Sequence, residues 1–457
     1  MHSGEIAMRI ERDSLGEFEV PAEAKYGVHS MRAYKNFFIS GVPVSEFPEL
    51  VIALAQVKKA AAAANTKLGV LDAERARAIQ DACDEIIGGA HHDQFIVDMI
   101  QGGAGTSSNM NANEVIANIA LAKMGHSLGA YQHLHPNDDV NRSQSTNDVY
   151  PTALRLAILR NVDSLTLEQR RLSDAFEAKA VEFDHVHKVG RTQLQDAVPM
   201  TLGQEFRSFA NTIEEDIERI GEISLLLREV NLGGTAIGTS INTPPEYPGT
   251  AVAELSRVVG FELKLARNLI EASSDLGAFV MFSGVLKRIA VKLSKICNDL
   301  RLLSSGPRAG LGEIVLPAVQ AGSSIMPGKV NPVIPEVVNQ VAFQVIGNDL
   351  TVTMAAEAGQ LQLNAFEPVA IFNILQSIRI LKRAMRCLTD RCVVGIAANE
   401  AHCRSLLNNS LVLATGLVPI LGYENAAKIA KHALATGKSV ADAAAELGYE
   451  AGDIFYD

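Results

Sequence analysis

A-G-S-S-I-M-P-G-K-V-N-P-V-I-P-E-V-V, which spans residues 321–338, cannot form one regular helix or strand. Two glycines and three prolines interrupt it, so we expect a loop that opens a helix after Pro332. The loop carries two hydroxyls, one cation and one amide, namely Ser323, Ser324, Lys329 and Asn331.

The chemistry of this loop favours binding of a small carboxylate beside a serine whose proton can be removed. Successive backbone N–H groups in a glycine-rich turn form a concave anion site, and the following helix adds its positive N-terminal end. Lys329 contributes a point charge. The alternative is an ordinary Gly/Pro-rich surface turn, but polar clusters elsewhere in the chain favour the functional interpretation.

Composition indicates a large helical protein. The chain has 457 residues, enough for two or three domains, and its 47% hydrophobic content includes no Trp and few aromatic residues, which suits packed helices. A net charge of −11 argues against a nucleic-acid partner or an acidic membrane surface. No apolar run reaches the length of a membrane helix.

The five cysteines are scattered and form no C-x-x-C pair. Together with a polar N-terminus, they predict a reduced, cytoplasmic protein without a cysteine-based metal site. His91, His92 and Asp93 are adjacent, but neighbouring side chains on a helix or strand diverge, so we do not expect them to chelate a metal.

Two polar clusters precede the long helices. Residues 101–113 read Q-G-G-A-G-T-S-S-N-M-N-A-N; they lack the G-K-[ST] of a phosphate loop, so a polar ligand cradle and a set of helix-capping residues both remain open. In residues 135–150, the three residues Ser145, Thr146 and Asn147 stand at the entrance of a helix that follows Pro151, where anions are favoured. Three such residues are more than a cap requires.

Apolar residues recur every three or four positions in five segments, which are 154–180, 202–227, 279–303, 335–355 and 368–394. This pattern predicts five long helices packed as a bundle, with stripes that become buried between subunits of a homo-oligomer. We therefore expect an N-terminal domain over 1–142, a central bundle over 143–398 and a small helical domain over 399–457. A purely structural rod is the alternative, although polar connectors such as 190–199 do not suit it.

These motifs resemble the aspartase/fumarase superfamily along nearly the whole chain. The signature G-S-S-I-M-P-G-K-V-N-P at 322–332 is highly specific for it. G-G-A-G-T-S-S-N-M-N-A-N-E-V, N-D-D-V-N-R-S-Q-S-T-N-D-V-Y-P-T-A, G-R-T-Q-L-Q-D-A-V-P-M-T-L-G-Q-E-F and Q-L-Q-L-N-A-F-E-P-V are similar to the aspartate ammonia-lyases within it. The resemblance implies an all-α, three-domain chain, a homotetramer with a twenty-helix core, and composite active sites built from three subunits.

The resemblance also implies a role for each site residue. Ser323 matches the general base that removes the Cβ proton of L-aspartate to give an enediolate and then fumarate. Ser145, Thr146, the Ser324 backbone and the nearby Thr106 match donors to the β-carboxylate. The residues that match contacts to the α-carboxylate are Lys329, Asn331 and Thr192. The residues that match contacts to the amino group are Asn147 and Thr106. No metal or organic cofactor is required, although activation by a divalent cation stays open.

Gln193 is also expected to bind substrate, but it differs from the residue that many members of the superfamily have at this position. Fumarases and some aspartases have a histidine there, paired with a glutamate that Glu336 matches. Gln193 cannot titrate, which suits loss of an already protonated amine better than loss of hydroxide. The alternatives are a fumarate hydratase and a non-catalytic structural member of the superfamily; argininosuccinate and adenylosuccinate lyases share only the loop signature.

Overall fold

Residues 7–449 are described by a computed structural model, in which α-helices predominate. The chain divides into two compact units. Unit one comprises Met1–Leu165, Arg219–Lys287 and Gln344–Arg379, and unit two comprises Thr166–Glu218, Arg288–Phe343 and Ile380–Asp457. The domain boundaries expected near residues 142 and 398 stay predictions.

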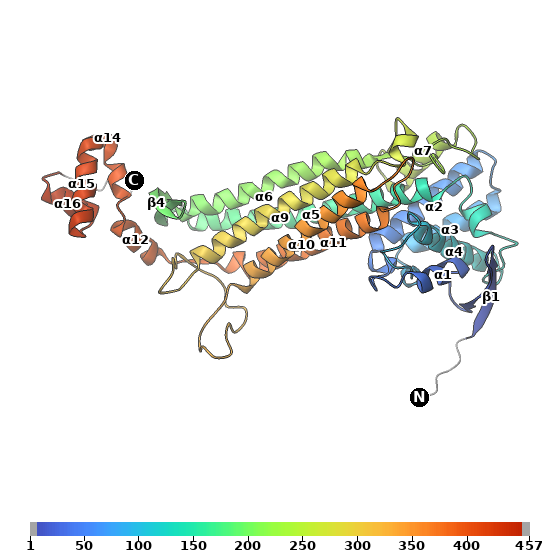
Figure 1. The fold of residues 1–457 in the computed structure, drawn as a ribbon, viewed down its shortest axis with the longest axis horizontal. Helices are drawn as coiled ribbons and strands as arrows, with labels where there is room; N and C mark the ends of the chain where they lie inside the picture. Colours follow the sequence, from blue (N-terminus) through green and yellow to red (C-terminus); the bar gives the residue numbers. More distant parts are fainter. Residues whose placement is uncertain (1–6, 450–457) are drawn as a thin grey trace. The chain divides into compact units, whose positions relative to one another are not determined.

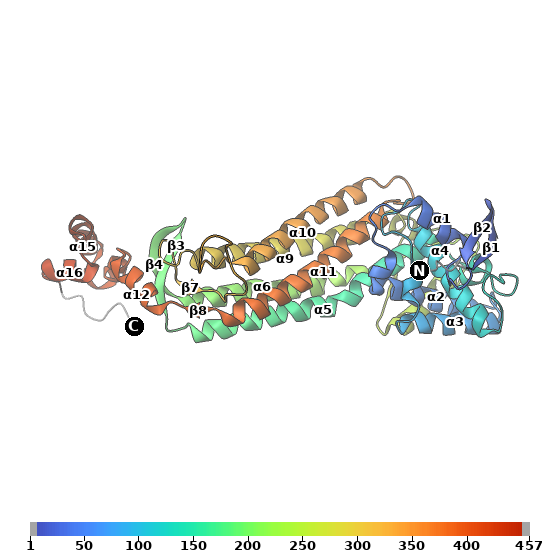
Figure 2. The same ribbon diagram turned by 90° about the horizontal axis from the view of Figure 1, so that it is seen from below.

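Five long helices each contribute a segment to both units: α5 Thr146–Glu182, α6 Leu202–Ser224, α9 Gly277–Leu303, α10 Val333–Glu357 and α11 Glu367–Arg391. Figures 1 and 2 show these segments side by side within each unit. The predicted five-helix pattern is therefore confirmed, because each predicted segment overlaps one of these helices, although the segments 202–227 and 368–394 extend three residues past the ends of α6 and α11.

Helix α5 begins at Thr146, five residues before the predicted start at Pro151. A proline inside a helix cannot donate to the carbonyl four residues earlier, which here belongs to Asn147. The side-chain amide of Asn231 donates to that carbonyl at 3.0 Å. Because a long-range partner replaces the missing bond, the helix extends back through the polar residues.

The rest of unit one surrounds its helix segments with shorter elements. The helices are α1 Val28–Asn36, η1 Val44–Glu46, α2 Pro48–Lys67, α3 Ala73–Ile87, η2 His92–Gln94, α4 Thr106–Lys123, η3 Pro136–Val140, η4 Leu226–Arg228, α7 Tyr247–Val259 and α8 Leu269–Ala272. The strands are β1 Met8–Asp13 antiparallel to β2 Gly16–Pro21, with Met8 opposite Pro21, and β5 Glu229–Val230 parallel to β6 Lys264–Leu265. The core of α2 is built from small and aliphatic side chains that are fully buried.

Unit two adds a hairpin and the C-terminal helices. Its strands are β3 His187–Thr192 antiparallel to β4 Gln195–Thr201, and β7 Ile314–Val315 antiparallel to β8 Ala397–Ala398. Its helices beyond the long segments are η5 Val393–Gly395, α12 Glu400–Asn409, α13 Leu413–Gly416, α14 Val418–Leu421, α15 Tyr423–Thr436 and α16 Val440–Glu446. The predicted polar connector at 190–199 does lie between α5 and α6, and it forms most of the β3–β4 hairpin, which the sequence pattern did not indicate.

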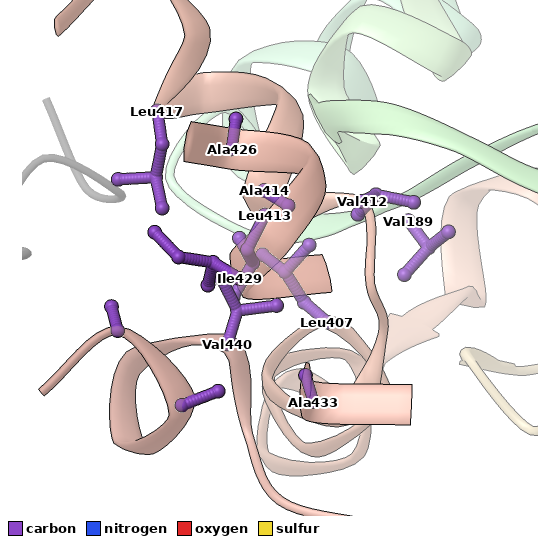
Figure 3. Close-up of a cluster of buried hydrophobic side chains, with 12 residues drawn as sticks. Val189, Leu407, Val412, Leu413, Ala414, Leu417, Ala426, Ile429, Ala433 and Val440 are labelled. Carbon is purple, nitrogen blue, oxygen red and sulfur yellow. The ribbon is translucent and has the colours of Figure 1, made fainter. Parts of the chain in front are cut away.

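The C-terminal helices pack on this hairpin. Figure 3 shows Val189 of β3 beside the buried side chains of Leu407 and Val412. The same cluster includes Leu417 and Ile429 from the helices farther along the chain. Burial of these side chains fixes the base of the hairpin, so its tip projects from a rigid support.

Within residues 7–449, no helix is both long and apolar enough to cross a membrane. The five cysteines are all unpaired thiols.

A buried carboxyl group at the start of α11 makes the stability of the fold depend on pH. Burial raises the pKa of Glu367 to about 8, and the positive charge of Arg155 only partly opposes the shift. In the unfolded chain this carboxyl has its ordinary pKa of 4.5. The folded protein therefore holds a proton that the unfolded chain releases as the pH rises above 4.5. The stabilisation from this proton is complete below that value and is lost as the pH rises through about 8.

We expect the melting temperature of the wild type, relative to that of a Glu367→Gln variant, to fall by several degrees between about pH 5 and pH 9. Glutamine keeps the shape of the protonated side chain but does not titrate. Thermal melts at three pH values measure the difference, with Glu74→Gln on the exposed start of α3 as the matched control. Melting curves that shift in parallel at every pH would contradict this assignment.

Candidate active site

The segment that contains Ser323 forms a closed loop between α9 and α10 (Figure 1). The Gly322 N–H donates to the Lys329 carbonyl at 2.9 Å, and the Asn331 side-chain amide donates to the Gly322 carbonyl at 2.6 Å. A Cβ atom at Gly322 would lie 2.4 Å from the Lys329 carbonyl oxygen, so only glycine permits this closure. The loop is thus tied at its base, and helix α10 begins at Val333 as predicted.

The hydroxyl of Ser323 receives two backbone hydrogen bonds. The N–H groups of Ile325 and Met326 donate to its Oγ at 3.2 Å and 2.9 Å. Donors aimed at an oxygen stabilise its negatively charged form. This geometry is what a serine needs if it is to act as a base.

Ser323 and Lys329 line the same cavity, which has a volume of about 400 Å³ and is bounded by residues 318–323 and 326–330. Lys329 is exposed, and within residues 7–449 it has no ion-pair partner. An unpaired ammonium beside a hydroxyl with two N–H donors makes an electropositive recess. Such a recess can take a small carboxylate.

The second group of predicted residues lies at the start of α5. Asp148 holds this turn, because its Oδ1 accepts from the Ser145 N–H at 2.9 Å. Its Oδ2 accepts from the N–H groups of Gly233 and Thr235 at 2.8 Å and 3.1 Å, so the turn is fixed to the loop before α7. Burial raises the pKa of Asp148 to about 6, against the opposing effect of these N–H donors. Ser145 lines a cavity of about 280 Å³.

The hydroxyl of Thr146 is positioned by buried amides. Asn109 of α4 donates to Thr146 Oγ1 at 3.1 Å and also contacts Asn141 Oδ1 at 3.2 Å. Since the Thr146 oxygen accepts this bond, its own proton stays available to a ligand. The side-chain amides of Asn109 and Asn113 are buried and both donate to Asn141 Oδ1 at 3.2 Å, so they support the turn before α5, and the choice between a ligand cradle and capping residues for 101–113 stays a prediction.

Lys58 supports the same turn, and little in the sequence indicates this role. It is fully buried in α2, and its Nζ donates to Asn141 Oδ1 at 2.8 Å and Gln144 Oε1 at 2.9 Å. Burial lowers its pKa to about 7, although Asp148 opposes the shift. The only sequence signal was one of two adjacent lysines, Lys58 and Lys59, inside an Ala-rich helix, where snorkelling to the surface is the usual explanation.

Asn147 and Thr106 both keep acceptor atoms free for a ligand. The Asn147 side-chain N–H donates to the Ala236 carbonyl at 2.7 Å, so its Oδ1 can accept from an ammonium group. The Thr106 hydroxyl donates to the Gly103 carbonyl at 2.7 Å, which leaves its lone pairs free. Both arrangements suit the predicted contact with an amino group.

Thr192 and Gln193 lie at the exposed tip of the β3–β4 hairpin. Gln193 and Leu194 have φ angles of 54° and 61°, as in the two-residue turns that match strand twist. Glu336 lies in the first turn of α10.

His91 and His92 lie near the end of α3. His91 contacts the Glu85 carboxylate at 2.9 Å, and His92 contacts the Ile86 carbonyl at 2.8 Å.

The predicted site residues fall into two sets. Unit one holds Thr106, Ser145, Thr146 and Asn147, and unit two holds Thr192, Gln193, Ser323, Ser324, Lys329 and Asn331. The first set offers hydroxyls and acceptor atoms, and the second set offers the Ser323 hydroxyl with its two N–H donors and the ammonium of Lys329.

Comparison with known proteins identifies the family. Residues 16–347 match the family described as Lyase, and residues 413–453 match the C-terminal segment of fumarase C. The aspartate ammonia-lyase of Pseudomonas fluorescens is 62% identical over 447 residues, which cover 98% of this chain and 94% of that protein. The chain belongs to the aspartase/fumarase superfamily.

Solved structures of the superfamily share the fold. A fumarate lyase:delta crystallin from Brucella melitensis, solved bound to cobalt, is 62% identical with a TM-score of 0.96, covering 98% of this chain and 97% of that one. A class II fumarase from Schistosoma mansoni is 35% identical with a TM-score of 0.92 over the same shares. The predicted all-α superfamily fold is therefore confirmed, with four two-stranded sheets in the described part.

Proposed function

We propose that this chain catalyses the reversible elimination of ammonia from L-aspartate to give fumarate. The observation that carries the proposal is the pair of backbone N–H donors on Ser323 Oγ, in a recess shared with Lys329, which has no ion-pair partner among residues 7–449. Relatives named aspartate ammonia-lyase at 56% to 62% identity support this carbon–nitrogen lyase activity over the other activities of the superfamily.

In the proposed mechanism, deprotonated Ser323 removes a proton from the Cβ atom of L-aspartate. The electron pair of the C–H bond moves onto the β-carboxylate, which becomes an enediolate. Hydroxyls of Ser145 and Thr146 and the backbone N–H of Ser324 stabilise this charge, since preorganised donors act where charge develops. The pair then returns to form the C=C bond as the C–N bond breaks, and ammonia leaves with its electrons.

The remaining residues orient the substrate. Lys329, Asn331 and Thr192 bind the α-carboxylate, and the free oxygens of Asn147 and Thr106 accept from the α-ammonium group. Holding both ends of the substrate places its Cβ proton near the base. No metal or organic cofactor takes part in these steps, and a divalent cation remains a candidate activator.

We also propose that a homotetramer brings the two sets together in composite sites. Helix α10 exposes large apolar side chains at spacings of three and four residues, with exposed fractions between 37% and 64%, namely Phe343, Ile346, Leu350 and Met354. An apolar face of this kind suits burial between long helices of several subunits. A twenty-helix core would result from four such chains. The five unpaired thiols fit a reducing, cytoplasmic location.

Fumarate hydratase activity is the second candidate, because the Schistosoma mansoni fumarase shares the fold. Gln193 disfavours it, since a carboxamide cannot protonate a departing hydroxide. The proposal is tested in reverse by proton NMR of fumarate incubated with the protein and ammonium. We expect L-aspartate to form when ammonium is present, and no L-malate to form when ammonium is absent. Formation of L-malate from fumarate and water alone would contradict the proposal.

A further inference from the structure

A cluster of charged side chains is buried at the base of the β3–β4 hairpin in unit two. Glu313, which immediately precedes β7, has a fully buried carboxylate that pairs with Lys188 Nζ at 2.9 Å. It also pairs with Arg191 Nη1 at 2.7 Å. Lys188 has Glu205 of α6 as a second partner. One carboxylate thus holds two cations of the same strand.

The main chain of Glu313 is itself fixed. Its N–H donates to the Leu303 carbonyl at the end of α9, and its carbonyl accepts from the Asn399 N–H, both at 2.9 Å. Since both backbone groups are bonded to separate elements, the side chain projects from a rigid point. Charges buried in this way are costly unless they are paired, so the geometry of the cluster is strongly specified.

Arg191 joins this cluster to the tip of the hairpin. It lies next to Thr192, and the pairing of β3 with β4 shifts register between Gly190 and Arg191. An irregularity of this kind turns the following side chains to a new direction. Thr192 and Gln193 are exposed, and the buried hydrophobic cluster reaches β3 at Val189. The Arg191–Glu313 pair therefore lies between that support and the substrate-binding residue.

We infer that Glu313 is a positioning residue for the lyase reaction, which fixes Thr192 through Arg191 for contact with the substrate α-carboxylate. The inference rests on the proposed function. It assigns Glu313 no contact with substrate, so its loss should weaken substrate binding more than the chemical step.

A Glu313→Gln variant tests this role, because glutamine keeps the size of the side chain and removes its charge. We expect the KM for L-aspartate to rise about 10-fold with kcat changed less than about 3-fold, as for a small displacement of one binding group. Glu205→Gln is the matched control, since it removes a carboxylate partner of Lys188 but does not touch Arg191. Its KM should stay within about twofold of the wild type.

A double-mutant cycle separates positioning from a structural role. If Glu313 acts through Thr192, then adding Glu313→Gln to a Thr192→Ala variant should lower kcat/KM by less than about twofold further. The inference would be overturned if the losses of kcat/KM in the two single variants multiplied in the double variant. It would also be overturned if Glu313→Gln lowered the melting temperature and left the KM unchanged. Should Glu313→Gln fail to fold, Arg191→Met must give the same KM increase.

The wild type, assayed first with L-aspartate, separates the two proposals. No activity in the wild type defeats the proposed function. An active wild type with an unchanged KM in Glu313→Gln and Arg191→Met defeats only the positioning role.

Discussion

A Ser323→Ala variant should lose turnover with L-aspartate, with kcat lower by about 10³-fold or more, because it lacks the group that removes the Cβ proton. The same variant should keep its melting temperature and its sedimentation coefficient. Among residues 7–449, the hydroxyl is hydrogen-bonded only to the N–H groups of Ile325 and Met326, in a largely exposed loop, so it contributes little to packing. Fumarate absorbance measures the rate, and sedimentation velocity measures assembly.

Ser324→Ala is the matched control for this prediction. Ser324 is exposed, and its expected contact with substrate uses the backbone N–H, which alanine retains. We expect kcat within about 3-fold of the wild type. Retention of a tenth of wild-type activity by Ser323→Ala, with Ser324→Ala the more damaged variant, would show that the base is assigned to the wrong residue.

The second large effect is expected for Lys329→Ala, which should lower kcat/KM by about 100-fold. Within residues 7–449, the ammonium of Lys329 has no ion-pair partner to lose, so the change should act on the substrate carboxylate and on the basicity of Ser323. We expect a higher KM and a pH profile whose rising limb moves to higher pH. Both follow from removing a positive charge beside an anion.

Lys295→Ala on α9 serves as the control for charge, because Lys295 is exposed and, among the described residues, its ion-pair partner is Asp299 of the same helix. Its kcat/KM should match that of the wild type. An unchanged rate for Lys329→Ala at every concentration of L-aspartate would place Lys329 outside the site.

The long helices were predictable because apolar spacing reports helix burial directly, as for Leu202 to Ser224 of α6. Other features depended on contacts that sequence does not contain. Helix α5 begins before Pro151 because the side chain of Asn231, which is distant in the sequence, donates to the Asn147 carbonyl. The β3–β4 hairpin turns through Gln193 and Leu194 without the usual Asn-Gly signal, so it was missed.

The site itself was predictable in part. The loop around Ser323 followed from its residues, and the individual roles came from the family resemblance. The residues that support the site did not follow from the pattern, since Lys58, Asp148 and Glu313 each act through partners at distant positions in the chain. The proposed assembly of the two sets of residues into one site depends on contacts between subunits, which the pattern of a single chain does not contain.

The most direct test of the central claim is ultraviolet absorbance of fumarate after purified protein is added to L-aspartate, with L-malate in a parallel cuvette. We predict that absorbance rises with L-aspartate alone, with one ammonium ion released for each fumarate. A rise with L-malate alone would make the chain a hydratase and contradict the interpretation of Gln193. No change in either cuvette would contradict a catalytic role.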